Sequence, residues 1–284
     1  MAVLIEGKTV SLSVKEKVKE EVERLVEKAV YPCLAVIIVG NDPASRVYVN
    51  NKKKACEQTG IKSLEYALAE ETTEEELLAL IDKLNADDSV NGILCQLPLP
   101  KHINETAVIE RISSIKDVDC FSCVNVGKMW TGSAVFSPCT PAGIIELLDY
   151  YNIDCCGKNC VIIGRSNIVG KPMACLMLEK NATVTVAHSR TSNLKELCAS
   201  ADIIIAAVGK ARFVTADMVK DGAVVIDVGI NRMENGKLCG DVDFENVKEK
   251  AAYITPVPGG CGPMTIAILM KNTLAACKYQ NNIK

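Results

Sequence analysis

Short, continuous apolar runs alternate along the chain with longer segments that have helical spacing. In the first half, short strands are predicted at Leu34–Val39, Ser63–Ala69 and Gly92–Cys95, of which Leu34–Val39 is a continuous apolar run. The intervening segments predict helices over Ser11–Ala29, from about Ser45 to Gly60, from Thr73 to Leu84 and over Asn104–Ile112. Because strand and helix alternate, this half predicts a parallel sheet built from βαβ units.

A second alternating unit begins near Phe136. Its apolar runs predict strands at Asn159–Ile163, Ala182–Ala187, Ile203–Ala207, Ala223–Asp227 and Ile254–Val257. Helices are predicted over Ala142–Tyr151, Lys171–Glu179, Leu194–Cys198 and Met264–Tyr279. Thr140 followed by Pro141 predicts an N-cap with proline at the first helical position.

The pattern therefore predicts an α/β protein of two domains. Residues 1–138 would form the first domain and residues 139–263 a second, Rossmann-like domain. The final helix, about residues 264–284, is predicted to pack back on the first domain.

Composition narrows the class of protein. The 284 residues carry a formal net charge of −3, so no basic surface indicates nucleic-acid binding. No apolar run approaches the roughly 18 residues that span a membrane, and the N-terminus does not resemble a signal peptide. The 14 cysteines are scattered through predicted strands and helices, which favours reduced thiols in a cytoplasmic protein.

The segment Val161–Pro172 combines a strand, a glycine-containing turn and the start of a helix. Such a turn presents backbone amides and a helix N-terminus to a phosphate. Its spacing, Gly164-x-Ser166-x-x-x-Gly170, differs from the usual dinucleotide fingerprint, and an ordinary strand–helix turn is the alternative.

The residues that follow the next predicted strand, Ala182–Ala187, bear on whether the cofactor is NAD or NADP. An NAD site favours an acidic residue there, whereas this chain has Ser189 and Arg190, with Arg165 in the turn itself. Hydroxyl and cationic groups suit a 2′-phosphate, so we predict NADP, with NAD use left open.

Three further glycine-containing segments are candidate ligand loops. Gly229, in Asp227–Asn231, and Gly209 follow predicted strands, where a glycine permits close approach of a flat ligand. Thr255–Thr265 contains three prolines and three glycines before an apolar helix, which suits a rigid loop around a ligand. A plain loop is the alternative in each case.

Candidate catalytic side chains lie in the first half. Tyr48 and Lys52 are four residues apart and share a face of their predicted helix. Gln96, at a strand end, could hold an ammonium group, and Asp119 could accept paired N–H donors from a heterocycle. Taken singly, each also fits an ordinary surface residue.

A metal site is not expected. Cys120 and Cys123 form an isolated C-x-x-C, while zinc prefers four ligands. The two histidines, His102 and His188, lack metal-ligand spacing.

Several motifs together resemble one family. They are Y-V-x-x-K-x-K-A, G-I-L-x-Q-L-P-L-P, K-D-V-D, P-C-T-P, G-R-S-x-I-V-G-x-P and P-G-G-x-G-P-M-T, spread in order over residues 37–270. This set is similar to bifunctional methylenetetrahydrofolate dehydrogenase/methenyltetrahydrofolate cyclohydrolases. The resemblance implies oxidation of methylenetetrahydrofolate by NADP⁺, hydrolysis to 10-formyltetrahydrofolate, and a homodimer with a cleft between two α/β domains.

The resemblance also implies roles for individual residues. Lys52 would be the central catalytic residue, with Tyr48 packing on the folate ring, Gln96 pairing with Lys52 and Asp119 holding the pterin. Leu97 and Pro98 would line the folate site, and Pro258, Gly259, Gly262 and Pro263 would flank it. The expected NADP contacts are Gly164, Arg165, Ser166, Ser189 and Ile230.

Cysteines depart from the family pattern near the expected folate site. Cys120 replaces a glycine, Cys123 belongs to a pair that replaces His-Pro, and Cys95 and Cys261 occupy usual valine positions. These exchanges raise the hypothesis of thiol-sensitive activity. Harmless replacement by small residues is the alternative.

Overall fold

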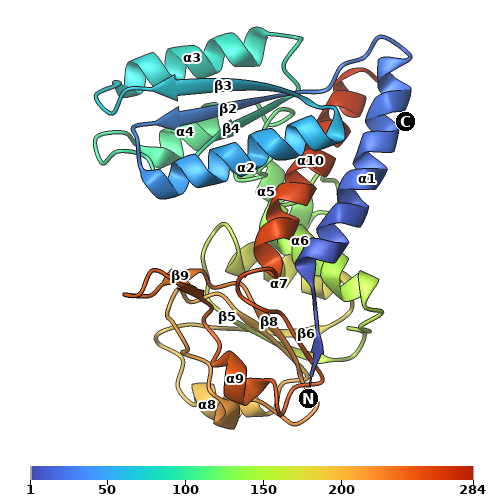
Figure 1. Cartoon of the computed structure of the whole chain (residues 1–284), viewed down its shortest axis with the longest axis vertical. Coiled ribbons are helices and arrows are strands. Elements are labelled where there is room, and N and C mark those ends of the chain that lie inside the picture. The colour runs from blue at the N-terminus through green and yellow to red at the C-terminus, as the bar shows by residue number, and fades with distance from the viewer. Residues whose placement is uncertain (1, 284) are drawn as a thin grey trace. The chain divides into compact units, whose positions relative to one another are not determined.

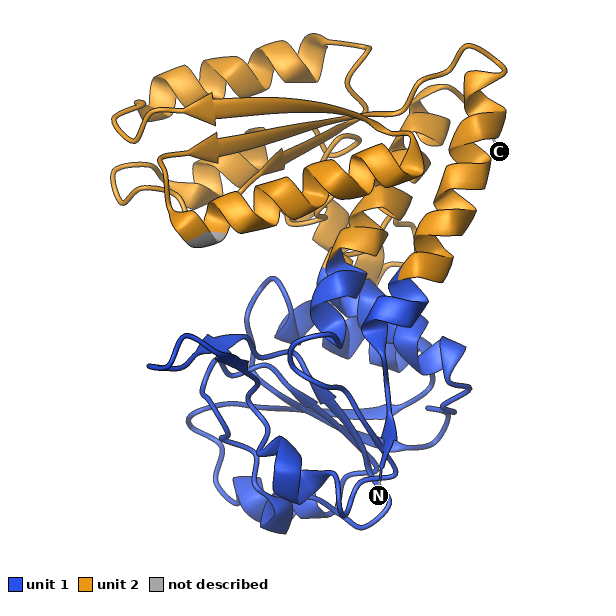
Figure 2. Ribbon diagram, viewed as in Figure 1, with its two compact units in different colours: residues 1–11, 140–265 blue, residues 12–139, 266–284 orange. Residues whose placement is uncertain are grey.

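Two parallel sheets organise the chain, one in each of two units. The computed structural model describes residues 2–283, apart from the side chain of Ala44. One unit contains the residues up to Ser11 together with Thr140–Thr265, and the other contains Leu12–Cys139 and the residues from Ile266 onward (Figure 2). We call them the six-stranded and the three-stranded unit.

The three-stranded unit is built on β2 (Cys33–Val39), β3 (Lys62–Leu68) and β4 (Gly92–Cys95), in the order β3-β2-β4. All three strands are parallel, as the alternating pattern predicted. Every residue of the central strand β2 is buried, which explains its continuous apolar sequence.

Helices cover both faces of this sheet. Side chains of α3 (Glu74–Ala86) and α4 (Glu105–Arg111) pack with alternate residues of β2, among them Ala35 and Ile37. The helix α2 (Pro43–Thr59) lies along the other face (Figure 1). The unit also contains α5 (Cys123–Trp130) and most of α1 (Gly7–Val26) and α10 (Cys261–Gln280).

Local signals in the sequence set where α2 and α3 begin. The carboxylate of Asp42 accepts a hydrogen bond from the backbone N–H of Ser45, with Pro43 at the start of α2. Thr73 and Glu76 form a reciprocal capping box at the start of α3. The left-handed Gly60 follows the end of α2. These ends fix the position of α2 relative to the strand before it.

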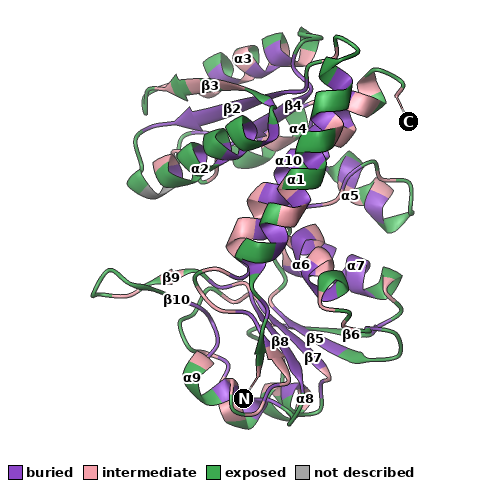
Figure 3. Ribbon diagram, turned by 45° about the vertical axis from the view of Figure 1, so that its right-hand side comes forward, coloured by how far each residue is buried: buried purple, intermediate pink, exposed green. Residues whose placement is uncertain are grey.

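The six-stranded unit has a wholly parallel sheet in the order β1-β11-β8-β7-β5-β6. Its strands are β1 (Val3–Leu4), β5 (Asn159–Ile163), β6 (Thr183–Ala187), β7 (Ile203–Ala206), β8 (Val224–Asp227) and β11 (Tyr253–Ile254). Strands β5, β7 and β8 are the buried centre of the sheet (Figure 3). The chain order reverses direction between β5 and β7, which is where α/β sheets bind ligands.

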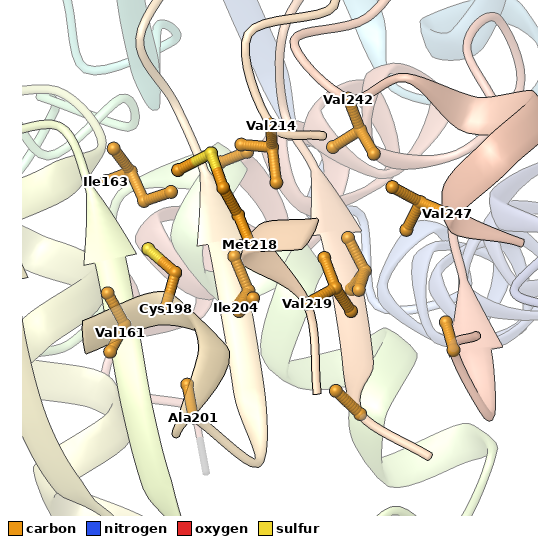
Figure 4. Packing of buried hydrophobic residues seen from close by; sticks show 14 of the residues in the cluster. Val161, Ile163, Cys198, Ala201, Ile204, Val214, Met218, Val219, Val242 and Val247 are labelled. Atoms are coloured by element: carbon orange, nitrogen blue, oxygen red, sulfur yellow. The ribbon is translucent and has the colours of Figure 1, made fainter. Parts of the chain in front are cut away.

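One face of this sheet packs on a hydrophobic core that includes Val161, Ile204 and Val225 (Figure 4). The core side chains come from the strands and from α8 (Leu194–Ala199), the short helix η1 (Ala216–Met218) and α9 (Phe244–Val247). The remaining elements are α6 (Cys139–Tyr150), α7 (Gly170–Glu179) and a hairpin of β9 (Asn231–Arg232) and β10 (Leu238–Cys239).

The N-terminal assignment was wrong. We placed all of residues 1–138 in the first domain, but β1 pairs with β11 of the six-stranded sheet. The backbone N–H groups of Val3 and Ile5 donate hydrogen bonds to the carbonyl oxygens of Ala252 and Ile254, both at 2.8 Å, which extends that pairing. Two residues of strand are too few to give a periodic signal in the sequence.

Several element boundaries also differ from the predictions. The helix α6 begins at Cys139, so Thr140 lies inside the helix and does not cap it. The hydroxyl of Thr140 lies 2.9 Å from the hydroxyl of Thr265.

Two predicted elements near the C-terminal end also have other bounds. The predicted strand Ile254–Val257 ends at Ile254, since Pro256 has no N–H to donate to the neighbouring strand. The helix α10 starts at Cys261 rather than Met264. The elements α5, α9 and the β9–β10 hairpin were not predicted.

Candidate functional site

The buried amine of Lys52 is the centre of a polar cluster in the three-stranded unit. Tyr48 and Lys52 lie one turn apart on α2, where Tyr48 is exposed and Lys52 is only 9 % exposed. The Nζ atom of Lys52 donates to Oε1 of Gln96 at 2.8 Å. The Nε2 atom of Gln96 donates to the carbonyl oxygen of Leu97 at 2.6 Å, which turns the amide oxygen toward the amine.

The sheet positions Gln96. Its backbone N–H donates to the carbonyl of Ile37 at 2.8 Å, which continues the β4–β2 pairing by one residue beyond β4. Leu97 is partly buried, Pro98 is exposed, and the peptide bond between them is cis. The structure thus brings Lys52 and Gln96 together, as the sequence predicted, while Pro98 lies at the surface.

Burial shifts the protonation of this cluster toward neutral groups. It lowers the pKa of Lys52 from its ordinary value of 10.5, although the nearby Asp119, Cys139 and Cys95 favour the charged amine. Burial likewise raises the pKa of Asp119, and the charge of Lys52 opposes that shift. The amine and the carboxylate are therefore coupled, and Lys52 can lose its proton more readily than a lysine in water.

The charged residues of the K-D-V-D segment, Lys116–Asp119, have two different kinds of partner. The Nζ atom of Lys116 donates to the carbonyls of Leu84 and Asp87 at 2.9 and 2.7 Å. The carboxylate of Asp117 accepts from the backbone N–H groups of Phe121 and Ser122 and from the side chain of Asn125. Lys116 and Asp117 hold the loop, whereas the carboxylate of Asp119 interacts electrostatically with the amine of Lys52.

The cysteine in place of the family's glycine keeps a glycine-like backbone. Cys120 has φ of 61°, in the left-handed region that most residues avoid. Its buried thiol lies 3.4 Å from the carbonyl oxygen of Phe136. Burial raises the pKa of both Cys120 and Cys95 to about 12, so both stay protonated thiols at neutral pH. Thiol-sensitive activity remains a prediction. Cys123 is exposed and so more accessible than Cys120 or Cys95, but the neighbouring Glu110 raises the pKa of its thiol as well.

In the turn from Gly164 to Gly170, called the Gly164 turn below, backbone segments pack directly against one another. Gly164 has φ of 130°, and a side chain there would place Cβ 2.2 Å from the carbonyl oxygen of Ala207. At Gly170 an added Cβ would lie 2.1 Å from the carbonyl oxygen of Gly164. The hydroxyl of Ser166 accepts from the backbone N–H of Val169 at 3.1 Å and so closes the turn. These contacts bring the strand end and the N-terminus of α7 together, as a phosphate-binding turn requires.

Other predicted cofactor contacts surround the carboxyl ends of the strands. Arg165 and Ser166 are exposed in the turn after β5, and Ser189 is exposed after β6. Ile230, 48 % exposed, follows β8. Because neighbouring parallel strands end at one edge of the sheet, these residues share that edge.

Two buried carboxylates, which sequence reasoning did not single out, fix the loops after β7 and β8. Asp241 accepts hydrogen bonds from the backbone N–H groups of residues 208–210 and from the side chain of Asn231. Asp227 accepts from the backbone N–H groups of Gly229, Asp241 and Val242. Burial raises the pKa of Asp227 to about 6, even though these three N–H donors favour its ionised form.

These carboxylates change the interpretation of Gly229. We expected its missing side chain to admit a flat ligand, but a Cβ there would lie 2.2 Å from Oδ1 of Asp241. Gly240 is restricted in the same way by Asp227, at 1.8 Å from Oδ2. Both glycines therefore make room for internal carboxylates. The paired pattern D-V-G and G-D-V-D is the signal that could have indicated this arrangement.

The proline- and glycine-rich loop is held against the start of α1. The backbone N–H of Lys8 donates to the carbonyl of Gly259 at 3.1 Å, and Gly260 donates to that of Pro256 at 2.8 Å. Pro258 is exposed. Gly262 and Pro263, predicted in the loop, belong instead to the first turn of α10.

Family models match both units. The tetrahydrofolate dehydrogenase/cyclohydrolase catalytic domain matches residues 5–119, and the NAD(P)-binding domain of the same family matches residues 138–281. The chain belongs to the tetrahydrofolate dehydrogenase/cyclohydrolase family.

Individual relatives agree with this assignment over the full length. The chain is 65% identical to a bifunctional protein FolD of Agathobacter rectalis over 98% of this chain and 100% of that protein. The bifunctional FolD structure from Campylobacter jejuni matches with a TM-score of 0.96 at 54% identity, covering 98% and 99% of the two chains. The Trypanosoma brucei enzyme, solved with NADP cofactor and inhibitor, matches with a TM-score of 0.93 at 38% identity and 98% coverage of both.

Within residues 2–283, no group of three or more His, Cys, Asp or Glu side chains is arranged to hold a metal ion. In the same range, no helix has the length and apolar character needed to cross a membrane.

The close packing at Gly164 leads to a prediction for NADP⁺ binding. Gly164→Ala should weaken NADP⁺ binding by about tenfold or more, because the added methyl group must displace the Ala207 carbonyl. Fluorescence titration with NADPH measures the effect. Gly222→Ala is the matched control, since Gly222 also has positive φ but open space around it, and it should bind NADPH normally. Equal affinity of both variants would contradict the prediction.

Proposed function

We propose that this chain performs two consecutive reactions through the Lys52 cluster. In the first, 5,10-methylenetetrahydrofolate transfers a hydride to NADP⁺ and becomes the 5,10-methenyltetrahydrofolate cation. In the second, water adds to that cation, a proton leaves and the ring opens to 10-formyltetrahydrofolate. The family membership and the buried Lys52–Gln96 pair support this assignment together.

The residues of the six-stranded unit fit NADP. The closely packed Gly164 turn places the N-terminus of α7, the positive end of the helix dipole, beside the carboxyl end of β5, where a phosphate can bind. Arg165 and Ser189, both exposed at the ends of β5 and β6, offer a cation and a hydroxyl to a 2′-phosphate. In this proposal Gly164, Arg165, Ser166, Ser189 and Ile230 hold the cofactor, which supplies a hydride acceptor.

The three-stranded unit would hold the folate. Tyr48 offers an exposed aromatic ring one helical turn from Lys52, suited to stacking on the pterin. Asp119 would accept the pterin N–H donors, with Leu97 and Pro98 beside Gln96 as further contacts. Pro258, Gly259, Gly262 and Pro263 are proposed folate contacts from the proline- and glycine-rich segment.

The buried amine suits both steps. Loss of hydride leaves a delocalised positive charge on the substrate, and a charged lysine beside it would oppose this. Because burial lowers the pKa of Lys52, the amine can be neutral when that charge develops. In the second step the neutral amine can accept a proton from the attacking water. Gln96 keeps the amine oriented through its oxygen, which is not itself a base at neutral pH.

Three further properties are proposed from the family resemblance alone. They are a homodimer, a location in the cytoplasm and a place in one-carbon metabolism. Light scattering coupled to size-exclusion chromatography would test the dimer.

The decisive experiment follows the two reactions separately with purified protein. Formation of the reduced cofactor and decay of the methenyl compound are measured with NADP⁺ and NAD⁺ in parallel. We expect both reactions, with a preference for NADP⁺. Activity in only one assay would indicate a monofunctional enzyme, and activity in neither would indicate a folate-binding homologue without turnover.

Lys52→Met should abolish most of the second reaction. Removal of a general base lowers such a rate by about 10²–10⁴-fold. Lys53→Met, on the exposed side of the same helix, is the matched control and should retain full activity. If Lys52→Met hydrolyses the methenyl compound at the normal rate, Lys52 has no part in the mechanism.

The hydrolysis rate should rise with pH. The base is the neutral amine, which accumulates above the pKa of Lys52, and burial places that pKa below 10.5. After subtraction of the uncatalysed rate, the profile of kcat should therefore show an ascending limb centred below 10.5. This limb should be missing in Lys52→Met. A flat profile in the unchanged chain would argue against proton transfer to Lys52.

A further inference from the structure

Four hydrogen-bond donors from two loops converge on the side chain of Asp241. This residue is 0 % exposed. Its Oδ2 atom accepts hydrogen bonds from the backbone N–H groups of Val208 and Gly209 at 2.7 and 2.9 Å. Its Oδ1 atom accepts from the backbone N–H of Lys210 and from Nδ2 of Asn231, both at 2.9 Å. The carboxylate therefore uses both of its oxygens to hold chain segments that are distant from it in the sequence.

The loop after β7 presents three successive backbone N–H groups, those of residues 208–210, to this carboxylate. Gly209, in the middle, has a left-handed φ of 66°. Successive amides in such a turn form a concave nest that binds anions. Because an internal carboxylate fills the nest, the loop after β7 is a structural support and not itself a phosphate site.

This loop packs directly against the Gly164 turn. Ala207 precedes Val208, and its carbonyl oxygen is the atom that an added Cβ at Gly164 would meet at 2.2 Å. The backbone N–H of Ala207 donates to the carbonyl of Ile163, the last residue of β5, at 2.8 Å. By holding the loop from Val208 onward, Asp241 fixes the backbone on which Gly164 rests.

The second anchored segment follows β8, the strand beside β7. Asn231, which donates to Asp241, comes directly after Ile230, a proposed cofactor contact. Gly229 has no side chain in the way, since a Cβ there would lie 2.2 Å from Oδ1 of Asp241. The one carboxylate thus holds the residues on both sides of this part of the sheet edge.

We propose that Asp241 is a positioning residue that holds the loops after β7 and β8 in the arrangement that binds NADP. The inference rests on the proposed function for the placement of Gly164 and Ile230 at the cofactor. Asp241 itself is buried and does not touch the cofactor in this proposal. Its effect should therefore appear in cofactor binding and not in the chemistry at Lys52.

Asp241→Asn tests the proposal with little change of shape. Asparagine has one acceptor oxygen, so whichever way its amide turns, its NH₂ group faces two of the four N–H donors. We expect Kd for NADPH and KM for NADP⁺ to rise about tenfold or more, while kcat at saturating NADP⁺ changes by less than about twofold. Fluorescence titration with NADPH and steady-state kinetics measure these values.

Two controls separate positioning from a general loss of structure. Hydrolysis of the methenyl compound uses no cofactor, so its rate should change by less than about twofold in Asp241→Asn. Asp243→Asn makes the same change of charge two residues away. The carboxylate of Asp243 accepts from Nδ2 of Asn246 at 2.6 Å, at the start of α9, and this variant should bind NADPH normally.

A milder variant covers the case in which Asp241→Asn does not fold. Asn231→Ala removes one of the four hydrogen bonds and leaves Asp241 and the nest of residues 208–210 in place. It should weaken NADPH binding about threefold with a normal rate of hydrolysis. Normal NADPH affinity in Asn231→Ala, when Asp241→Asn is unfolded, would overturn the proposal.

The remaining outcomes distinguish this inference from the proposed function. Unchanged NADPH affinity in a folded Asp241→Asn would refute the positioning role alone. Equal weakening in Asp241→Asn and Asp243→Asn would also refute it, because the effect would then follow charge or stability. If the unchanged chain binds NADPH but converts neither folate compound, the proposed function fails, while the NADPH titrations still decide the role of Asp241.

Discussion

The burial of the Lys52 amine is the constraint on which the polar cluster of the three-stranded unit depends. Lys52 sits on α2 between a strand-end amide and a carboxylate loop, and its burial opposes its charge. Its neighbours Asp119, Cys139 and Cys95 favour the charged amine, and burial outweighs them. Gln96 provides a neutral acceptor, while Asp119 provides an acidic group whose own pKa burial has raised. The unit thereby holds an amine that loses its proton more readily than a lysine in water.

The general architecture followed from the sequence because each local signal agreed with the packing. Short apolar runs became the buried strands β2, β4, β7 and β8 of the two parallel sheets. Thr73 and Gly60 marked helix ends where expected. The pairing of Lys52 with Gln96 also followed, through motif resemblance. By contrast β1 was missed, because its two residues gain their order from pairing with β11 and not from their own pattern.

The finer assignment of polar residues could not be predicted. Within K-D-V-D, the sequence offers two aspartates of equal chemistry, and only the fold shows Asp117 tied to backbone amides while Asp119 faces the amine. The buried amide of Asn272 was not singled out either, since the carbonyl groups that it binds, those of Val118 and Ser137, lie 154 and 135 residues away in the sequence. Gly229 was misinterpreted for a similar reason, because its constraint comes from the carboxylate of Asp241. Long-range contacts decide such roles, and a single sequence does not record them.

The carboxylate of Asp241 anchors two separate segments of the six-stranded unit. It binds the loop after β7 and also Asn231, at the base of the β9–β10 hairpin. The tip of the hairpin is closed separately, by backbone hydrogen bonds of Met233 with Gly236 and Lys237. One buried side chain thus couples the loop after β7 to the root of the hairpin, so that displacement of either segment disturbs the anchor of the other.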